Sequence, residues 1–153
     1  MTSEEKNNVL KYKRFTKTAI PPYRAYTQSC GLDLTSDEDD VTIRPGQSVK
    51  VSTGLGFQLP AGTYGRLAPR SGLALLGIDI LGGVIDQGFS DVVKCIIINH
   101  GPNEFVLKRG MRICQLILEK FASCECVETE ELPKSDRRGG FGSSGMMTSS
   151  LQN

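Results

Sequence analysis

The apolar residues of this chain alternate with polar ones at a period of two, and this constrains the fold more than any other feature. Short alternating runs occupy residues 41–43, 49–51 and 55–59. Such alternation places the apolar side chains on one face of an extended strand. Turn signals follow at Pro45-Gly46 and Pro60-Ala61-Gly62. The pattern therefore predicts short strands that are joined by tight turns.

The second half of the chain continues this pattern. Residues 92–98 form a nearly continuous β-branched run, typical of a strand that is buried on both faces. Further strands are expected over 105–107 and 111–121, and the only good helix candidate is short, residues 71–76. Many short strands with turns between them predict an all-β barrel or sandwich.

Length and charge remove several functional classes. A chain of 153 residues suits one domain. Its 18 Lys and Arg against 17 Asp and Glu leave no overall field that would recruit nucleic acid or a membrane. No apolar run approaches the roughly 20 residues of a membrane span, and the charged N-terminus lacks a signal core. Neither a nucleic-acid nor a membrane partner is expected.

The cysteines predict an intracellular protein, in the cytoplasm or the nucleus. There are five, an odd number, and their spacing is irregular; His100 is the single histidine. A structural zinc site would need four nitrogen or sulfur ligands in close pairs. Reduced thiols are the simplest interpretation.

The two ends of the chain differ from its middle. We expect a polar segment with the first strand over residues 1–24 and a β-barrel over 25–131. Residues 132–145, rich in Gly, Ser and Arg, predict a flexible arm, and 146–153 a tail. The four consecutive carboxylates at residues 37–40 are interpreted as a solvated turn rather than a metal site.

Two local patterns carry candidate chemistry. Arg70 precedes a short helix that begins with Ser71 and Gly72, and a helix N-terminus binds anions. An ordinary helix start with a surface arginine fits that pattern equally well. Asp86 follows an apolar run that starts with two glycines, Gly82 and Gly83. It is a candidate general base toward water, although a turn-forming aspartate is the stronger local interpretation.

The glycine-rich stretch at residues 140–145 matches G-x-G-x-x-G. No strand precedes it and only eight residues follow, so a dinucleotide-binding fold is not predicted. Its backbone N–H groups and hydroxyls could wrap phosphate oxygens, with Arg137 and Arg138 beside them. Composition alone favours a disordered tail.

Taken together and in order, five segments resemble the motifs of the trimeric deoxyuridine triphosphatases (dUTPases). They are Ser29-Cys30-Gly31-Leu32-Asp33-Leu34, Pro69-Arg70-Ser71-Gly72-Leu73-Ala74, Gly83-Val84-Ile85-Asp86, Gly110-Met111-Arg112-Ile113-Cys114-Gln115-Leu116 and Gly139-Gly140-Phe141-Gly142-Ser143-Ser144-Gly145. The resemblance spans about residues 25–145, and it outweighs the local interpretations above.

The resemblance implies a distorted jelly-roll β-barrel that forms a homotrimer, with the C-terminal arm exchanged between subunits. It also implies hydrolysis of dUTP to dUMP and pyrophosphate with Mg²⁺ held mainly by the phosphates. Asp86 would be the base that activates water, Gln115 would hold that water, and Asp33 would reach Mg²⁺ only through water.

The same resemblance assigns the substrate contacts. A second subunit would bind the phosphates through Arg70, Ser71 and Gly72. The backbone of the Gly83, Val84 and Ile85 segment would select uracil, with a matching contact near Lys94, and Phe89 would pack under the deoxyribose and exclude a 2′-hydroxyl. Phe141 would stack on uracil, and the γ-phosphate would be covered by Arg137, Gly142, Ser143 and Ser144.

The sequence departs from the family pattern in three places. Phe89 replaces a usual tyrosine, Ser90-Asp91 replaces Arg-Gly, and the arm is one residue shorter before its glycine pair. The last change leaves Arg137 or Arg138 as the γ-phosphate contact, and Arg137 is preferred. Two alternatives stay open: a dCTP deaminase-like enzyme, and a catalytically weak nucleotide-binding protein on the same scaffold.

Overall fold

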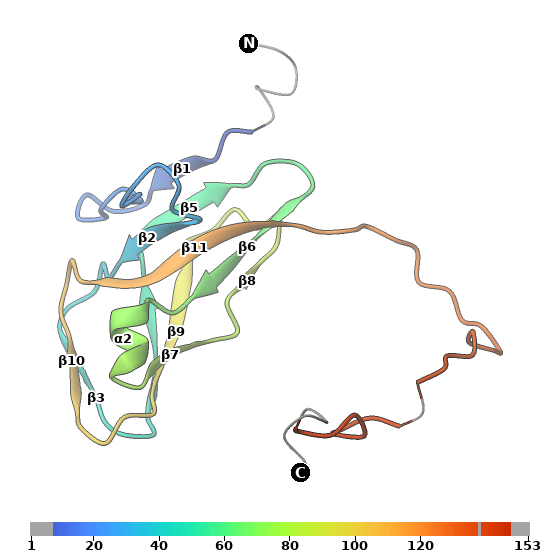
Figure 1. Ribbon diagram of the computed structural model, residues 1–153. Coiled ribbons are helices and arrows are strands. Elements are labelled where there is room, and N and C mark those ends of the chain that lie inside the picture. The colour runs from blue at the N-terminus through green and yellow to red at the C-terminus, as the bar shows by residue number, and fades with distance from the viewer. Residues whose placement is uncertain (1–7, 138, 148–153) are drawn as a thin grey trace. The chain divides into compact units, whose positions relative to one another are not determined.

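The computed structural model describes residues 8–137 and 139–147, which divide into two compact units at Ala122 and Ser123 (Figure 1). The first unit is built almost entirely of strands. They are β1 (Lys11–Arg14), β2 (Gly31–Thr35), β3 (Val41–Ile43), β4 (Ser48–Ser52), β5 (Leu55–Gln58), β6 (Thr63–Ala68), β7 (Ile78–Leu81), β8 (Val84–Ile85), β9 (Lys94–Asn99), β10 (Phe105–Leu107) and β11 (Arg112–Lys120). One short helix, α2, covers Ser71–Leu75.

The strands pair antiparallel in four sheets. The largest has the order β2-β11-β6-β8, and a second has the order β4-β9-β7. Two further pairs join β1 to β5 and β3 to β10. In Figure 1 the long strand β11 runs between β2 and β6. The predicted all-β fold is confirmed, and the neighbours along β11 bring distant motifs of the sequence together.

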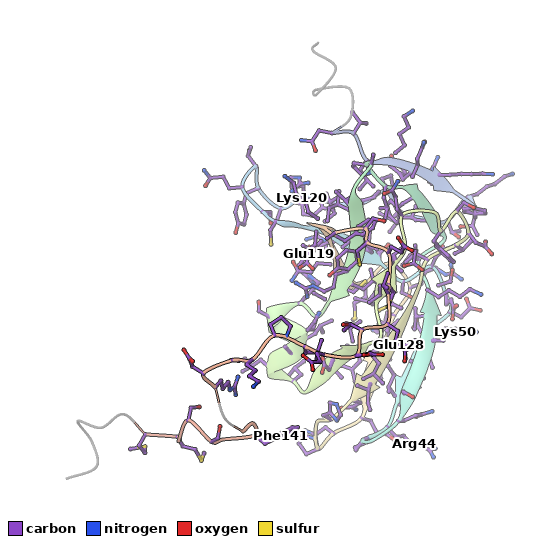
Figure 2. The ribbon with its side chains drawn as sticks, turned by 90° about the vertical axis from the view of Figure 1, so that its right-hand side faces the viewer. Arg44, Lys50, Glu119, Lys120, Glu128 and Phe141 are labelled. Carbon is purple, nitrogen blue, oxygen red and sulfur yellow. The ribbon has the colours of Figure 1, made fainter. Side chains whose placement is uncertain are left out.

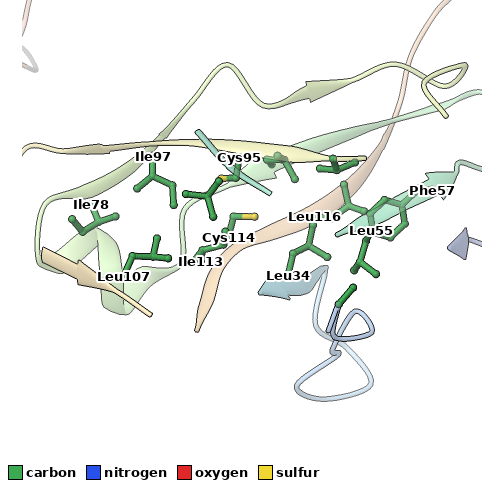
Figure 3. Close-up of a cluster of buried hydrophobic side chains, with 14 of the residues drawn as sticks. Leu34, Leu55, Phe57, Ile78, Cys95, Ile97, Leu107, Ile113, Cys114 and Leu116 are labelled. Atoms are coloured by element: carbon green, nitrogen blue, oxygen red, sulfur yellow. The ribbon is translucent and has the colours of Figure 1, made fainter. Parts of the chain in front are cut away.

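The core lies between these sheets and collects the apolar half of each alternating strand. Leu34 of β2 and Leu116 of β11 are almost fully buried, together with Ile97 of β9 (Figure 3). Burying a side chain of this size stabilises the fold by roughly 1.5–3 kcal/mol. Cys114 packs here beside Cys95, and the neighbouring thiol and burial raise the pKa of Cys114. These two cysteines therefore act as small apolar residues of the core.

The burial predicted for the strand at residues 92–98 is wrong. The run at residues 92–98 was expected to be buried on both faces, but β9 begins at Lys94 and alternates. Cys95 and Ile97 point into the core, whereas Ile96 is 41% exposed. The alternation arises because β9 is the central strand of a sheet that turns one face to the core.

The acidic run at residues 37–40 is only partly the expected solvated turn. The side chain of Asp39 is exposed, but the carboxylate of Asp37 is buried. Arg109 Nη1 lies 3.1 Å from Asp37 Oδ1, and the hydroxyl of Thr16 donates to Asp37. Asp37 therefore ties together the N-terminal segment and the β10–β11 connection. This role could not be predicted from the sequence, because Arg109 lies 72 residues farther along the chain.

The second unit contains no helix or strand over the described residues 123–137 and 139–147, all of which are exposed. The first compact unit ends at Ala122. The boundary expected between the β-barrel and the arm, between residues 131 and 132, stays a prediction. No helix in the described part of the chain is long and apolar enough to cross a membrane.

Candidate active site

The outer face of the four-stranded sheet carries several of the predicted site residues. Gln115 of β11 lies opposite Asp33 of β2 on one side and Ala68 of β6 on the other. Side chains alternate along a strand, so Leu116 enters the core while Gln115 and Asp33 share the outer face. Motifs that are about 80 residues apart in the sequence thus become neighbours.

Asp33 lies among positive charges. Its Oδ1 is 3.2 Å from Arg70 Nε, and its Oδ2 is 4.0 Å from Arg112 Nη1. Arg70 also donates from Nη1 to the Arg112 carbonyl at 3.3 Å, and Arg112 lies over the Tyr23 ring at 4.0 Å from its centroid. These contacts hold two guanidinium groups at one end of the sheet, where they favour an anionic ligand.

Helix α2 begins directly after this cluster. Arg70 is its N-cap residue, and its side chain makes no capping hydrogen bond. Ser71 and Gly72 in the first turn are exposed. The first N–H groups of a helix have no partner within the helix, so they can donate to an anion. Arg70, Ser71 and Gly72 thus occupy the N-cap and the first turn of α2.

The side chain of Gln115 is anchored at the same end. Its Nε2 donates to the Pro69 carbonyl at 3.0 Å, one residue before Arg70. Gln115 thus contacts the turn that carries the phosphate-binding candidate. Of the predicted residues, Asp33, Arg70 and Gln115 form one cluster.

Asp86 belongs to a different part of the sheet. Gly83, at a φ of +81°, accepts a hydrogen bond from the Leu67 N–H at 2.7 Å, and Val84 and Ile85 then pair with β6. Asp86 follows at the end of β8 and accepts a bond from the Phe89 N–H at 3.0 Å, which closes a tight turn. Both Asp86 and Phe89 are exposed.

Asp86 lines a shallow cavity of about 300 Å³. The remaining lining comes from Tyr64, Val84, Gln87 and Phe121. Most of this lining is apolar, with Asp86 as its charged group. The cavity presents one carboxylate on an accessible surface, as a base that acts on water requires.

Within one chain, the structure does not bring Asp86 and Gln115 together. Gln115 pairs with Ala68, whereas Ile85 pairs with Gly65, three residues earlier on β6. At roughly 3.3 Å per residue this separates the two positions by about 10 Å along the strand. They also lie on opposite sides of β6, which adds roughly 9–10 Å across the sheet. The candidate base and the candidate water ligand therefore belong to two separate clusters of this chain.

Between these clusters lies a network that the sequence analysis missed. Glu119 accepts from Arg66 Nε at 2.9 Å and from the hydroxyl of Tyr64. These bonds, with Arg66 as the larger cause, lower the pKa of Glu119, and the bond to Glu119 raises the pKa of Tyr64. Figure 2 labels Glu119 near the end of β11. The period-two spacing of Tyr64 and Arg66 is the signal that would have placed both on one face.

The residues expected to select uracil lie where two strands separate. The pairing of β7 with β9 ends at Leu81 and Ile96. Continued in that register, Gly83 would face Lys94, but Gly83 instead bonds to Leu67 of β6, and Lys94 pairs with Ser52 of β4. The pairing of β7 with β9 therefore does not continue to Gly83 and Lys94.

The glycine-rich arm forms a succession of turns in the second unit. Phe141 has a φ of +50° and Gly142 a φ of +94°. The Ser143 N–H donates to the Gly140 carbonyl at 3.3 Å, and Phe141 is fully exposed (Figure 2). Ser144 is exposed as well. Of the two arginines considered, Arg137 is exposed, and Arg138 lies outside the described residues.

The donor set fits a cation that the protein holds only indirectly. The described residues contain no group of three or more His, Cys, Asp or Glu side chains that could bind a metal. Asp33 offers carboxylate oxygens next to two arginines, and Mg²⁺ prefers oxygen ligands while keeping several waters.

Most of the chain matches a known family. The dUTPase family model matches residues 17–145. The chain belongs to the dUTPase family. The deoxyuridine 5′-triphosphate nucleotidohydrolase of Paramecium bursaria Chlorella virus 1 is 42% identical over 136 residues, which are 88% of this chain and 96% of that protein. The Candida glabrata enzyme of the same name is 43% identical over 141 residues, or 90% and 97% of the two chains.

A solved dUTPase also shares the fold. The Staphylococcus bacteriophage 80alpha dUTPase with dUpNHpp superposes with a TM-score of 0.83 at 27% identity. The match covers 91% of this chain and 99% of the phage protein. The all-β architecture of this dUTPase family member is therefore that of a solved family member.

Proposed function

We propose that this chain, as a member of the dUTPase family, hydrolyses dUTP to dUMP and pyrophosphate. The observation that carries the proposal is the family match over residues 17–145, which includes both surface clusters described above. In the proposed reaction the carboxylate of Asp86 takes a proton from water as the water oxygen attacks the α-phosphorus. The α–β bridging oxygen leaves with pyrophosphate. Gln115 holds the same water.

The active site is proposed to form between subunits of a homotrimer. The separation of Asp86 from Gln115 within one chain supports this, because one water must contact both side chains. A second subunit would present its Arg70, Ser71, Gly72 and Gln115 to the Asp86 cluster of the first. Exposed apolar side chains near Asp86, such as Val84 at 64% and Phe121 at 45%, are suited to such a contact.

Charge supports an exchange of the C-terminal arm between subunits. Strand β1 is exposed along its whole length and carries Lys11, Lys13 and Arg14. In the described residues it pairs only with β5, so one edge is free. The segment at residues 125–131 carries four glutamates and is exposed. An acidic extended segment from a neighbour can add to a basic edge strand by backbone hydrogen bonds.

Uracil is proposed to bind between Gly83 and Lys94, beyond the point where the pairing of β7 with β9 ends. Backbone groups there can pair with the base edge, and a tight slot would exclude the methyl group of thymine. Phe89 follows on the same hairpin, and its ring would pack under deoxyribose where a 2′-hydroxyl would clash. The Val84 and Ile85 backbone holds this hairpin to β6.

The triphosphate is proposed to be bound from two directions. Arg70 and the N–H groups of Ser71 and Gly72 bind from the barrel, and the arm covers the γ-phosphate with Arg137. The turns of the arm expose N–H groups and hydroxyls at Gly142, Ser143 and Ser144, and such turns bind anions. Phe141 stacks on uracil.

Mg²⁺ is the proposed cofactor, and when bound it neutralises charge on the phosphate oxygens. Asp33 would contact it only through water. The two arginines beside Asp33 are consistent with this indirect role, because they form ion pairs with its carboxylate. An intracellular location is also proposed, since all five cysteines are free thiols.

A pyrophosphate-release assay tests the function directly. Purified protein is incubated with Mg²⁺ and dUTP, UTP, dTTP or dCTP in parallel. We expect rapid release from dUTP and little from the other three. Release of ammonia from dCTP would instead indicate a deaminase, and no turnover of any nucleotide would indicate a binding protein.

A further inference from the structure

Gly31 lies directly beneath the side chain of Gln115. Gln115 pairs with Asp33, and Gly31 comes two residues earlier on β2, so Gly31 and Gln115 are diagonal neighbours on the outer face. A Cβ at Gly31 would lie 2.3 Å from Gln115 Oε1, 3.0 Å from its Cβ and 3.1 Å from its Cδ. All three distances are shorter than van der Waals contact, so a side chain at this position would displace the amide.

Backbone conformation does not explain this glycine. Gly31 is not among the glycines with a positive φ, and it pairs regularly with Ile117 of β11. Any residue could adopt its extended backbone. The space taken by Gln115 is therefore the feature that requires glycine.

The other end of the Gln115 amide is also fixed. Its Nε2 donates to the Pro69 carbonyl at 3.0 Å. Pro69 precedes Arg70, whose Nε is 3.2 Å from Asp33. The amide thus contacts the Pro69 carbonyl through Nε2 and lies against Gly31 through Oε1, so a methyl group at Gly31 is expected to disturb its hydrogen bond to Pro69.

We propose that Gly31 is a positioning residue for Gln115: the absent side chain allows the amide to lie against β2 and to bond to Pro69. This inference rests on the proposed function, in which Gln115 holds the attacking water. A misplacement of about 1 Å can cost on the order of 10²-fold in rate. Gly31→Ala is therefore expected to lower kcat for dUTP by about 10- to 100-fold, with a smaller change in KM.

A double-mutant cycle tests this role. In a Gln115→Ala background the amide that the new methyl group would displace is gone. Gly31→Ala should then change kcat by less than about twofold, the margin for independent effects. A structural defect unconnected with Gln115 would lower kcat by the same factor in both backgrounds, and that result would overturn the proposal.

Gly56→Ala is the matched control. Gly56 is also a strand glycine, and its added Cβ would lie 2.6 Å from the Phe15 ring, on the β1–β5 pair. It should lower the melting temperature while leaving kcat within about twofold in both backgrounds. The control thus separates the general effect of a steric clash in a strand from the specific effect of displacing Gln115.

Folding provides the second readout. If Gly31→Ala fails to fold, the double variant Gly31→Ala/Gln115→Ala decides the matter. Recovery of a cooperative thermal transition in the double variant supports the proposal, and its failure to fold overturns it. If the unaltered chain does not hydrolyse dUTP, the proposed function is rejected. That result differs from an equal loss of kcat in the two backgrounds, which rejects only the role of Gly31.

Discussion

The barrel and the C-terminal segment of this chain differ in the burial of their side chains and in strand pairing. In the barrel, side chains alternate between core and surface, and every strand pairs with another. In the described residues after Ser123, no side chain is buried and no strand forms. Glycines with positive φ, such as Gly139 and Gly145, allow the turns that replace strands there. The barrel is therefore expected to determine stability, and both regions to determine activity.

The largest expected effect is on catalysis within the barrel. Asp86→Asn retains the shape of the side chain but cannot accept a proton from water. Loss of a general base commonly costs about 10²–10⁴-fold in rate, and dUTP binding should be largely retained. Single-turnover kinetics and nucleotide titration measure the two quantities. Asp79→Asn, an exposed aspartate of β7, is the control and should leave turnover unchanged. Near-normal turnover by Asp86→Asn would remove this residue from the mechanism.

Removing residues 136–153 tests whether the segment contributes activity without stability. We expect kcat/KM for dUTP to fall on the order of 10²-fold, the loss seen when an anion-stabilising donor is removed. The melting temperature should barely change, because the described residues removed are exposed. Sedimentation should report an unchanged trimer. Full activity would show a dispensable tail, and dissociation would place the arm in the subunit interface.

A matched pair of leucines compares the stability of the two regions directly. Leu34→Ala empties a fully buried position, and such changes cost about 2–5 kcal/mol. Leu132→Ala removes the same atoms at a position that is 81% exposed, so its effect should be within about 0.5 kcal/mol. Chemical denaturation measures both. Equal losses would mean that residue 132 is buried in the assembled protein.

Phe89→Ala concerns selectivity rather than rate. The proposed ring excludes a 2′-hydroxyl, so its truncation should admit UTP. We expect the ratio of kcat/KM for dUTP over UTP to fall roughly tenfold, within the range of about 1–3 kcal/mol for a steric contact. Steady-state kinetics with both nucleotides decide the point. An unchanged ratio would assign sugar discrimination to another residue.

The smallest expected effect is the acid dependence of the Glu119 network. Its bonds to Arg66 and Tyr64 lower the pKa of Glu119 in the folded state. The network therefore stabilises the fold above the unfolded pKa of about 4.3, and this stability is lost as the pH falls through the lower folded pKa. Glu119→Gln should melt earlier than the unaltered chain at pH 7, and the gap should close in acid.

Thermal melting from pH 7 to pH 3 measures this gap. Glu104→Gln breaks the exposed Arg44–Glu104 pair (3.7 Å; Arg44 is labelled in Figure 2) and serves as the control. Exposed pairs contribute little, so its gap should be smaller at every pH. A gap for Glu119→Gln that stays constant with pH would mean that ionisation of Glu119 does not contribute to stability.

Local patterns in the sequence predicted several of the strands, but not β2, β6, β7 or β8. Alternation at residues 55–59 predicted β5, and the run at 111–121 predicted β11, because period two leaves a local pattern. The short helix after Arg70 was predicted within one residue of its observed end. The composition of the arm, rich in Gly, Ser and Arg, predicted a flexible segment with few residues that could join a core.

Which residues contact one another became known from the three-dimensional fold. The burial of Asp37, the bonds of Glu119 to Tyr64 and Arg66, and the contact of Gln115 with Gly31 all join distant parts of the chain. So does the separation of Asp86 from Gln115 across β6. Such contacts depend on strand order and register, which non-local pairing sets. Local hydrophobic periodicity fixes the face on which each side chain lies, but it does not specify the neighbouring strand.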